Sequence, residues 1–139
     1  MKFAIINGPN LNLLGQREPD VYGAKTLDGL ITDLRNRYSD HVILDYQSNV
    51  EGELINRLHE WDSEVDAFII NPGGYSHTSI AIRDAISAIA TPVIEVHISN
   101  IHSREDFRHT TITGGACKAV ISGLGLEGYS VALDQFLKA

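Results

Sequence analysis

The sequence predicts an α/β fold in which helices cover both faces of a five-stranded parallel sheet. Short apolar runs alternate with segments of helical periodicity along the 139 residues, and turn-forming Gly, Pro and Asn follow the runs. Apolar runs bounded in this way are typical of strands buried on both faces, which occur in parallel sheets. Alternating strands and helices are joined by right-handed crossovers, which place helices on the two faces of the sheet.

The clearest unit lies in the middle of the chain. The apolar run 67–70 leads into Asn71 and Pro-Gly-Gly, and isoleucines at helical spacing then predict a helix over about Ser79–Ile89. Polar side chains at the C-terminal end of such a strand lie where open α/β sheets bind ligands. We therefore expect this turn to form the floor of a site that includes Asn71, Tyr75, Ser76 and His77.

The remaining elements follow the same alternation. The other expected strands are Phe3–Ile6, Val42–Tyr46, Pro92–Val96 and Ala119–Ser122. The other expected helices run from about Thr26 to Tyr38, from a Ser48–Glu51 capping box to Trp61, and from about Glu127 onward. The pattern indicates a flavodoxin-like doubly wound sheet, with the first, third and fourth strands adjacent at its centre.

Length and charge limit the possible functions. The chain fits one domain, residues 1–139, with a core that needs no metal or disulfide. Eleven basic and 18 acidic residues give a net charge of −7, which argues against a general nucleic-acid or anionic-membrane binder. A small anionic substrate stays possible, because a local cluster of arginines suffices to bind it.

The N-terminal run and the single cysteine bear on location and on cofactors. Met1–Asn7 is too short an apolar run for a signal peptide, and no run of about 18 apolar residues follows, so we expect a soluble cytoplasmic protein. Cys117 is alone, so neither an intrachain disulfide nor a Cys-based zinc site is expected. The G-x-G-x-x-G match at 123–128 lacks the following strand and acidic residue of a dinucleotide site, so we expect it to form a tight turn. The expected chemistry therefore uses no cofactor and no metal.

Two long connections leave C-terminal strand ends and carry arginines. They are 8–25, with Arg17, and 97–118, with Arg104 and Arg108. Connections of this length in a compact domain are usually lids or binding loops. For the second connection, a short solvated helix from Arg104 to Arg108 is an alternative interpretation.

Two pairs of residues could carry acid–base chemistry. Glu95 and His97 point to the same face of their strand, and a carboxylate beside an imidazole fixes its tautomer and favours its protonated form. A structural carboxylate–histidine pair is the competing interpretation, and the strand end beside two long loops favours function. Arg17 and Tyr22 share one short segment, where a guanidinium would favour the tyrosinate needed for proton abstraction. An isolated tyrosine would more often simply pack a loop.

These motifs, taken together, resemble the type II 3-dehydroquinate dehydratases. The resemblance covers nearly the whole chain, in the right order, through the segments Asn7–Gly23, Asn71–Ser79, Glu95–Asn100, Arg104–Arg108 and Gly123–Tyr129. It departs at Thr110–Lys118, which lacks the Ser-Pro pair expected from the family. The resemblance implies dehydration of 3-dehydroquinate to 3-dehydroshikimate through an enolate, in aromatic biosynthesis or quinate breakdown.

The resemblance also implies a role for each matching residue. Tyr22 matches the general base, Arg17 the residue that favours the tyrosinate, and Asn12 the group that holds a water against the enolate oxygen. His97 matches the general acid, oriented by Glu95. The substrate-binding positions are matched by Asn71, His77, Arg108 and the backbone amides of Ile98 and Ser99. Asp84 matches a residue that reaches a neighbouring subunit's site in trimer-based dodecamers, and the role of Arg104 is less definite.

Two other functions compete with a dehydratase. A non-catalytic flavodoxin-like ligand-binding module would need a phosphate loop after the first strand, and none is present in the sequence. A hydrolase using Ser76 or Ser79 with His77 would need neighbouring residues on one turn to face each other, and the G-x-S-x-G motif is lacking.

Overall fold

The computed structural model describes residues 1–16, 20 and 24–138 and contains a five-stranded parallel sheet in the order β2-β1-β3-β4-β5. The strands are β1 (Lys2–Asn7), β2 (Val42–Gln47), β3 (Ala67–Asn71), β4 (Val93–His97) and β5 (Ala119–Ser122). The predicted central position of the first, third and fourth strands is therefore confirmed. This is the flavodoxin-like order, in which ligands bind beyond the carboxyl ends of the central strands.

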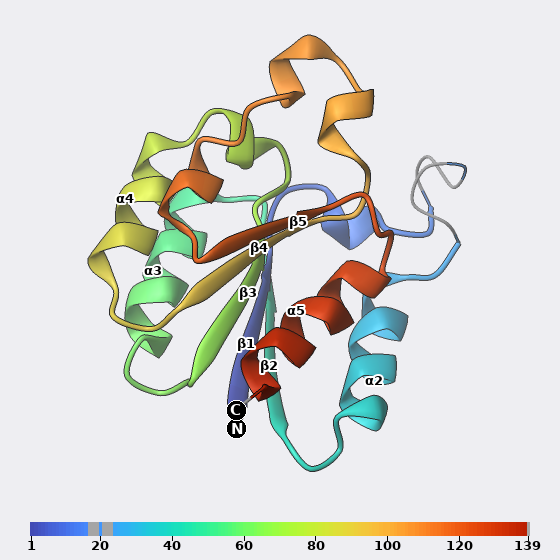
Figure 1. Ribbon diagram of the computed structural model, residues 1–139, viewed down its shortest axis with the longest axis vertical. Coiled ribbons are helices and arrows are strands. Elements are labelled where there is room, and N and C mark those ends of the chain that lie inside the picture. The colour runs from blue at the N-terminus through green and yellow to red at the C-terminus, as the bar shows by residue number, and fades with distance from the viewer. Residues whose placement is uncertain (17–19, 21–23, 139) are drawn as a thin grey trace.

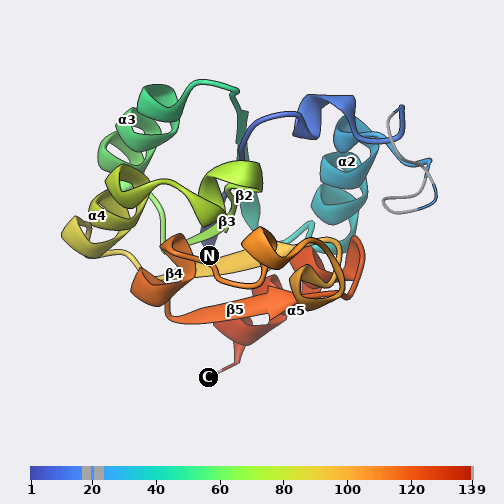
Figure 2. The same ribbon diagram turned by 90° about the horizontal axis from the view of Figure 1, so that it is seen from above.

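Helices cover both faces of the sheet, as predicted. Helices α3 (Glu51–Trp61) and α4 (Ile80–Ala88) lie on one face, and α2 (Leu27–Arg37) and α5 (Glu127–Leu137) on the other (Figures 1 and 2). Among the described residues, no helix combines the length and the apolar character that crossing a bilayer requires.

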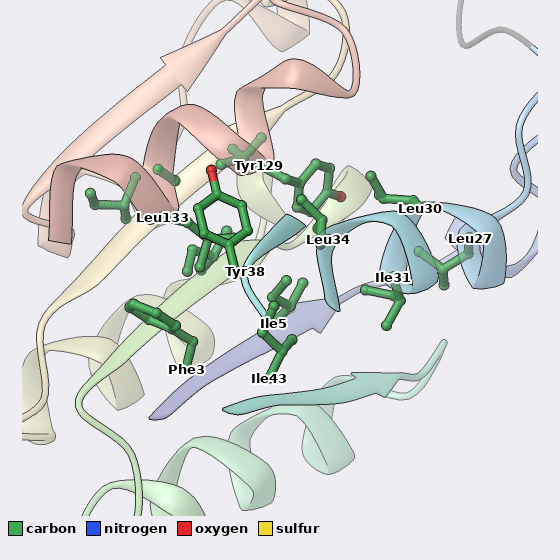
Figure 3. Packing of buried hydrophobic residues seen from close by; sticks show 14 of the residues in the cluster. Phe3, Ile5, Leu27, Leu30, Ile31, Leu34, Tyr38, Ile43, Tyr129 and Leu133 are labelled. Atoms are coloured by element: carbon green, nitrogen blue, oxygen red, sulfur yellow. The ribbon is translucent and has the colours of Figure 1, made fainter. Parts of the chain in front are cut away.

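The two-residue period of the strands divides the core into two layers. Phe3 and Ile5 of β1 pack with α2 and α5, whereas Ala4 and Ile6 pack with α3 and α4. Figure 3 shows the first layer, where the apolar stripe of α2 meets residues from β1, β2 and α5. These four side chains of β1 are fully buried, because the strand lies inside the sheet and is covered on both faces.

Hydroxyl groups cap two of the helices. The Thr26 hydroxyl accepts from the Gly29 amide at 3.1 Å, and the Ser79 hydroxyl accepts from the Ile82 amide at 2.9 Å. The predicted capping box at Ser48–Glu51 is wrong, because the N-cap of α3 is Val50 and its side chain makes no capping bond. Ser48 instead accepts from the Val50 amide and donates to Glu53.

The ends of β4 differ by one residue from the expectation. Pro92 lies outside the strand because it has no amide hydrogen to donate to the ladder, although its carbonyl accepts from the Phe68 amide at 2.9 Å. His97 lies inside the strand, paired in register with Ser122 of β5. The His97 backbone is therefore held by pairing with β5 at the carboxyl edge of the sheet.

The glycines after β5 form a turn, as predicted. Gly123 and Gly125 have φ angles of 89° and 62°, and their amides donate to the carbonyls of His97 and Ile98. Gly128 at the start of α5 lies so close to β4 that an added Cβ would meet Val96 at 3.0 Å. These contacts explain the glycine pattern by packing.

Candidate active site

Residues from the turns after β1, β3 and β4 line a cavity at the carboxyl ends of the central strands. Figures 1 and 2 show that the segment connecting β4 to β5 lies at this end of the sheet. Six of the predicted site residues line the cavity, together with Arg104: Asn71, His77, His97, Ile98, Ser99 and Arg108. Its other walls are apolar side chains and backbone from the turns after β1 and β3. The cavity thus combines imidazoles, arginines and amide groups at the edge where this fold binds ligands.

Glu95 and His97 form a buried pair, as their alternation along β4 predicts. His97 Nε2 lies 2.7 Å from Glu95 Oε2, and the two side chains are 7% and 0% exposed. Because a carboxylate can only accept, Nε2 carries the hydrogen of this bond. Nδ1 is then the ring nitrogen left for a ligand in the cavity.

The sequence analysis missed the other partners of Glu95. The hydroxyls of Thr111 and Thr113 both donate to its carboxylate from the segment before β5. The only signal in the sequence was a group of three threonines, Thr110, Thr111 and Thr113, within the long connection 97–118, and threonine is common in loops. Their contact with Glu95 depends on how the loop folds back over the strand.

His77 lies beside His97, with the two rings stacked at a centroid distance of 6.1 Å. His77 Nδ1 donates to the Thr110 carbonyl at 2.9 Å, which leaves Nε2 as an acceptor when the ring is neutral. Burial lowers the pKa of His77, the bond to Thr110 opposes this, and the charges of His97 and Arg108 lower it further. His77 is therefore a neutral hydrogen-bonding group at neutral pH.

We expect substrate binding to weaken in acid through His77. Folding lowers the pKa of His77, so the folded state favours the neutral ring. The contribution of His77 to the stability of the folded protein is therefore present above its unfolded pKa of about 6.5. This contribution is lost as the pH falls through the lower pKa of the folded state. Protonation also removes the Nε2 acceptor, so KM should rise in the same range. Kinetics as a function of pH should show this rise in the wild type.

In His77→Asn, which keeps a donor for Thr110, KM should be raised at neutral pH and should not rise further toward acid. An unchanged acid dependence in this variant would assign the effect to another group.

Asn71 is held at the floor of the cavity by a buried polar network. Its side-chain amide donates to the Tyr129 hydroxyl at 3.0 Å, and its carbonyl oxygen accepts from the Gly73 amide at 3.1 Å. The Tyr129 hydroxyl in turn donates to Asn7 at 2.5 Å, and burial raises the pKa of this phenol. Tyr129 therefore stays a neutral donor, and it joins β1, β3 and α5 beneath the site.

Both arginines of the connection after β4 reach the cavity. Arg104 Nη1 lies 3.3 Å from the Ser99 hydroxyl, and Arg108 Nε donates to Glu105 at 3.0 Å. Two short 3-10 turns, Ile101–Ser103 and Asp106–Arg108, replace the solvated helix considered as an alternative. Glu105 also lies 4.0 Å from Arg104 Nε, so one carboxylate pairs with both guanidinium groups. The cavity is thus lined by two guanidinium groups, which suit a small anion, on a protein of net charge −7.

Two predicted site residues within the described part of the chain, Asn12 and Asp84, do not line the cavity. Asn12 is exposed on the turn after β1, where Gln47 Nε2 lies 3.4 Å from its oxygen. Asp84 is exposed on α4, and the described residues that line the cavity do not include it. Arg17 and Tyr22 lie outside the described residues.

Tyr75 and Ser76 do not belong to the floor of the site, contrary to expectation. The Tyr75 hydroxyl donates to the Asn49 carbonyl at 3.0 Å, and its ring packs on the layer formed with α3 and α4. Ser76 is fully buried. The turn Gly73–His77 is a 3-10 helix, so adjacent side chains diverge and only some of them face the cavity.

The hydrolase alternative also lacks support in the described part of the chain. A serine nucleophile needs a hydrogen bond to its base. Ser79 caps α4 and donates to Glu51 at 2.6 Å, and His77 Nδ1 is occupied by Thr110. The described contacts show no serine hydrogen-bonded to His77.

A buried carboxylate–imidazole pair beside two arginines, at the carboxyl edge of a doubly wound sheet, defines a site for acid–base chemistry on a small anion. The family model described as dehydroquinase class II matches residues 1–137. A 3-dehydroquinate dehydratase of Exiguobacterium sp. is 52% identical over 139 residues, which cover 99% of this chain and 95% of that protein. A 3-dehydroquinate dehydratase of Aeromonas salmonicida is 52% identical over 134 residues, which cover 95% of this chain and 90% of that protein.

The solved structures agree with these relatives. The crystal structure of a type II dehydroquinase from Butyrivibrio crossotus has a TM-score of 0.96 at 42% identity, covering 99% of this chain and 98% of that one. The chain therefore belongs to the class II dehydroquinase family. This membership leaves the non-catalytic ligand-binding module without support.

Proposed function

We propose that this protein is a hydro-lyase that removes water from 3-dehydroquinate to give 3-dehydroshikimate through an enolate. The observation that carries the proposal is the family match over residues 1–137. The chain also places the buried Glu95–His97 pair at a cavity lined by two arginines. Residues 1–139 would act as one catalytic domain in the cytoplasm, in aromatic biosynthesis or quinate breakdown.

The first chemical step is removal of a proton from the carbon next to the ketone. We assign the base to Tyr22 and assign Arg17 to favouring its tyrosinate form, on the strength of the family motif Asn7–Gly23. Asn12 would hold a water against the enolate oxygen, and its contact with Gln47 leaves its amide group available for this bond. Such hydrogen bonds stabilise the charge that develops in the transition state.

The second step is loss of the hydroxyl β to the ketone as water. His97 would protonate it from Nδ1, because Nε2 is engaged by Glu95. The buried carboxylate stabilises the imidazolium before transfer and holds the ring in place afterwards. The enolate electrons form the conjugated double bond as the carbon–oxygen bond breaks, so atoms and charge balance without a redox step.

The substrate carboxylate needs a separate anion site. The amides of Ile98 and Ser99 follow β4 at the edge of the cavity, and we assign the carboxylate to them. Asn71, His77 and Arg108 would bind the ring hydroxyls. The neutral His77 ring offers an acceptor at Nε2, which suits a hydroxyl donor.

The test is to add 3-dehydroquinate to the purified protein and to follow the ultraviolet absorbance of the conjugated enone product. Activity should persist after treatment with chelator, and borohydride with substrate should not inactivate the protein, because no imine forms. A protein that leaves the substrate unchanged, or one that borohydride traps covalently through a lysine, would overturn the proposal.

We also propose that the working enzyme is a trimer-based dodecamer with shared active sites. Asp84 is exposed on α4, one turn from Ile80, which is 63% exposed. An exposed isoleucine beside an acid fits a subunit contact in which Asp84 approaches His77 and Arg108 of a neighbour. Gel filtration should then give a mass well above 15.3 kDa.

Subunit mixing tests the shared site directly. Asp84→Ala should lower activity in a folded oligomer, whereas Asp40→Ala, an exposed acid between α2 and β2, should not. Mixed oligomers of Asp84→Ala and Tyr22→Phe subunits should be more active than either variant alone, because some sites then combine two intact halves. A fully active monomer, or mixtures that recover nothing, would contradict the shared site.

A further inference from the structure

The carboxylate of Glu95 is held by hydroxyl groups of the segment that departs from the family pattern. Glu95 and Thr113 are both fully buried. The Thr111 hydroxyl lies 2.6 Å from Oε2, and the Thr113 hydroxyl is hydrogen-bonded to Oε1. With His97 Nε2 on Oε2, each carboxylate oxygen has a partner.

The direction of these bonds follows from the donors available. The Gly114 amide donates to the Thr111 oxygen at 3.0 Å, so the single Thr111 hydrogen is available for Glu95. The alternative acceptors of that hydrogen, the Ser76 carbonyl and the Thr113 hydroxyl, lie at 3.5 and 3.4 Å. A distance of 2.6 Å is in the range for a hydroxyl donating to an ionised carboxylate. The carboxylate of Glu95 thus accepts three hydrogen bonds.

The loop is built to bring both hydroxyls over the strand. A Cβ added at Gly114 would lie 2.6 Å from Thr111 and 3.0 Å from Glu95, so only glycine fits there. The Ile112 amide donates to the Ser76 carbonyl at 2.7 Å, and Arg83 of α4 donates to the Ile112 carbonyl at 2.9 Å. The segment is therefore anchored from two sides and does not approach Glu95 by chance.

We propose that Thr111 and Thr113 are positioning residues for the general acid, through Glu95. Their hydroxyls fix the position of the buried carboxylate, so that it holds the hydrogen of His97 on Nε2 and turns Nδ1 toward the substrate. The inference rests on the proposed dehydratase function for its kinetic consequences only. The hydrogen-bond arrangement stands on the contacts themselves.

The kinetic test replaces both hydroxyls by methyl groups. Thr111→Val with Thr113→Val should lower kcat on the order of ten- to a hundredfold, because the acid is misplaced, while KM changes little. Serine at both positions keeps the hydroxyls and should restore most of kcat. Thr91→Val is the matched control, since Thr91 is a half-buried threonine that bonds Asp62 at the other end of β4, and its kcat should be unchanged.

Single valine variants provide the measurement if the double variant does not fold. Each leaves Glu95 one threonine donor and should reduce kcat less than the pair. A folded valine variant with wild-type kcat, or a KM effect equal to the kcat effect, would overturn the inference.

A spectroscopic test separates this inference from the function. Magic-angle-spinning NMR of 15N-histidine-labelled protein reports which ring nitrogen carries hydrogen, whatever the size of the assembly. Neutral His97 should be protonated at Nε2 alone in the wild type and in mixed tautomers in the double valine variant. His97 protonated at Nδ1 in the wild type, or one tautomer in both proteins, would overturn the network. An inactive wild type with the expected tautomer would refute the function and leave the network standing.

Discussion

Replacing His97 by alanine is expected to lower kcat by about 10²–10⁴-fold, the usual contribution of a general acid, while KM changes far less. The proton goes to the departing hydroxyl only in the transition state, so its loss slows the chemical step and leaves ground-state binding largely intact. His77→Asn should show the opposite balance, because the proposed role of His77 Nε2 is to bind the substrate both before and during the reaction. Steady-state kinetics of the two variants measure the difference.

Solvent exchange assigns the His97 effect to one step. In deuterated water, His97→Ala should still exchange the substrate proton next to the ketone, because the base is intact and only the departure of water is blocked. His59→Ala, an exposed histidine on α3, is the matched control and should keep wild-type kcat. If His97→Ala lost exchange as well as turnover, or if it chiefly raised KM, the acid role would belong to another group.

Tyr22→Phe is expected to lower turnover at least as much, by about 10²–10⁴-fold or more, because we assign to its phenol oxygen the role of the base that starts the reaction. Phenylalanine keeps the ring, so substrate binding should survive better than catalysis does. Unlike His97→Ala, this variant should also lose deuterium exchange at the carbon next to the ketone. The contrast places the two residues on successive steps.

The matched control for Tyr22 is Tyr46→Phe. Tyr46 donates its hydroxyl to Glu53 on the face covered by α3, so loss of that hydroxyl should leave turnover unchanged. Arg17→Ala should lower turnover, because without the guanidinium less of Tyr22 is in the tyrosinate form. The pH profile of kcat should then shift toward alkaline pH. Near-normal turnover or retained exchange in Tyr22→Phe would remove the tyrosine from the base role.

The sequence by itself determined the sheet, the helices and the edge at which the site lies. Strand and helix periods differ, and each buried face requires its own spacing, so the patterns around β1 and α4 could be read locally. The same two-residue period placed Glu95 and His97 on one face of β4. The turn after the third strand indicated Asn71 and His77, and the second long connection indicated Arg108. The family motifs then gave these residues binding roles, and all three line the cavity with His97.

The tertiary structure alone decided which groups satisfy these site residues. Thr111 and Thr113 reach Glu95 across 16 and 18 residues, and Tyr129 joins Asn7 across 122. Tyr75 turns away from the floor of the site toward Asn49 on the α3 side. A sequence period reports the face on which a residue lies, because it follows from local backbone geometry. A hydrogen bond between distant segments depends on how the loops fold back over the sheet, and no local pattern encodes that path.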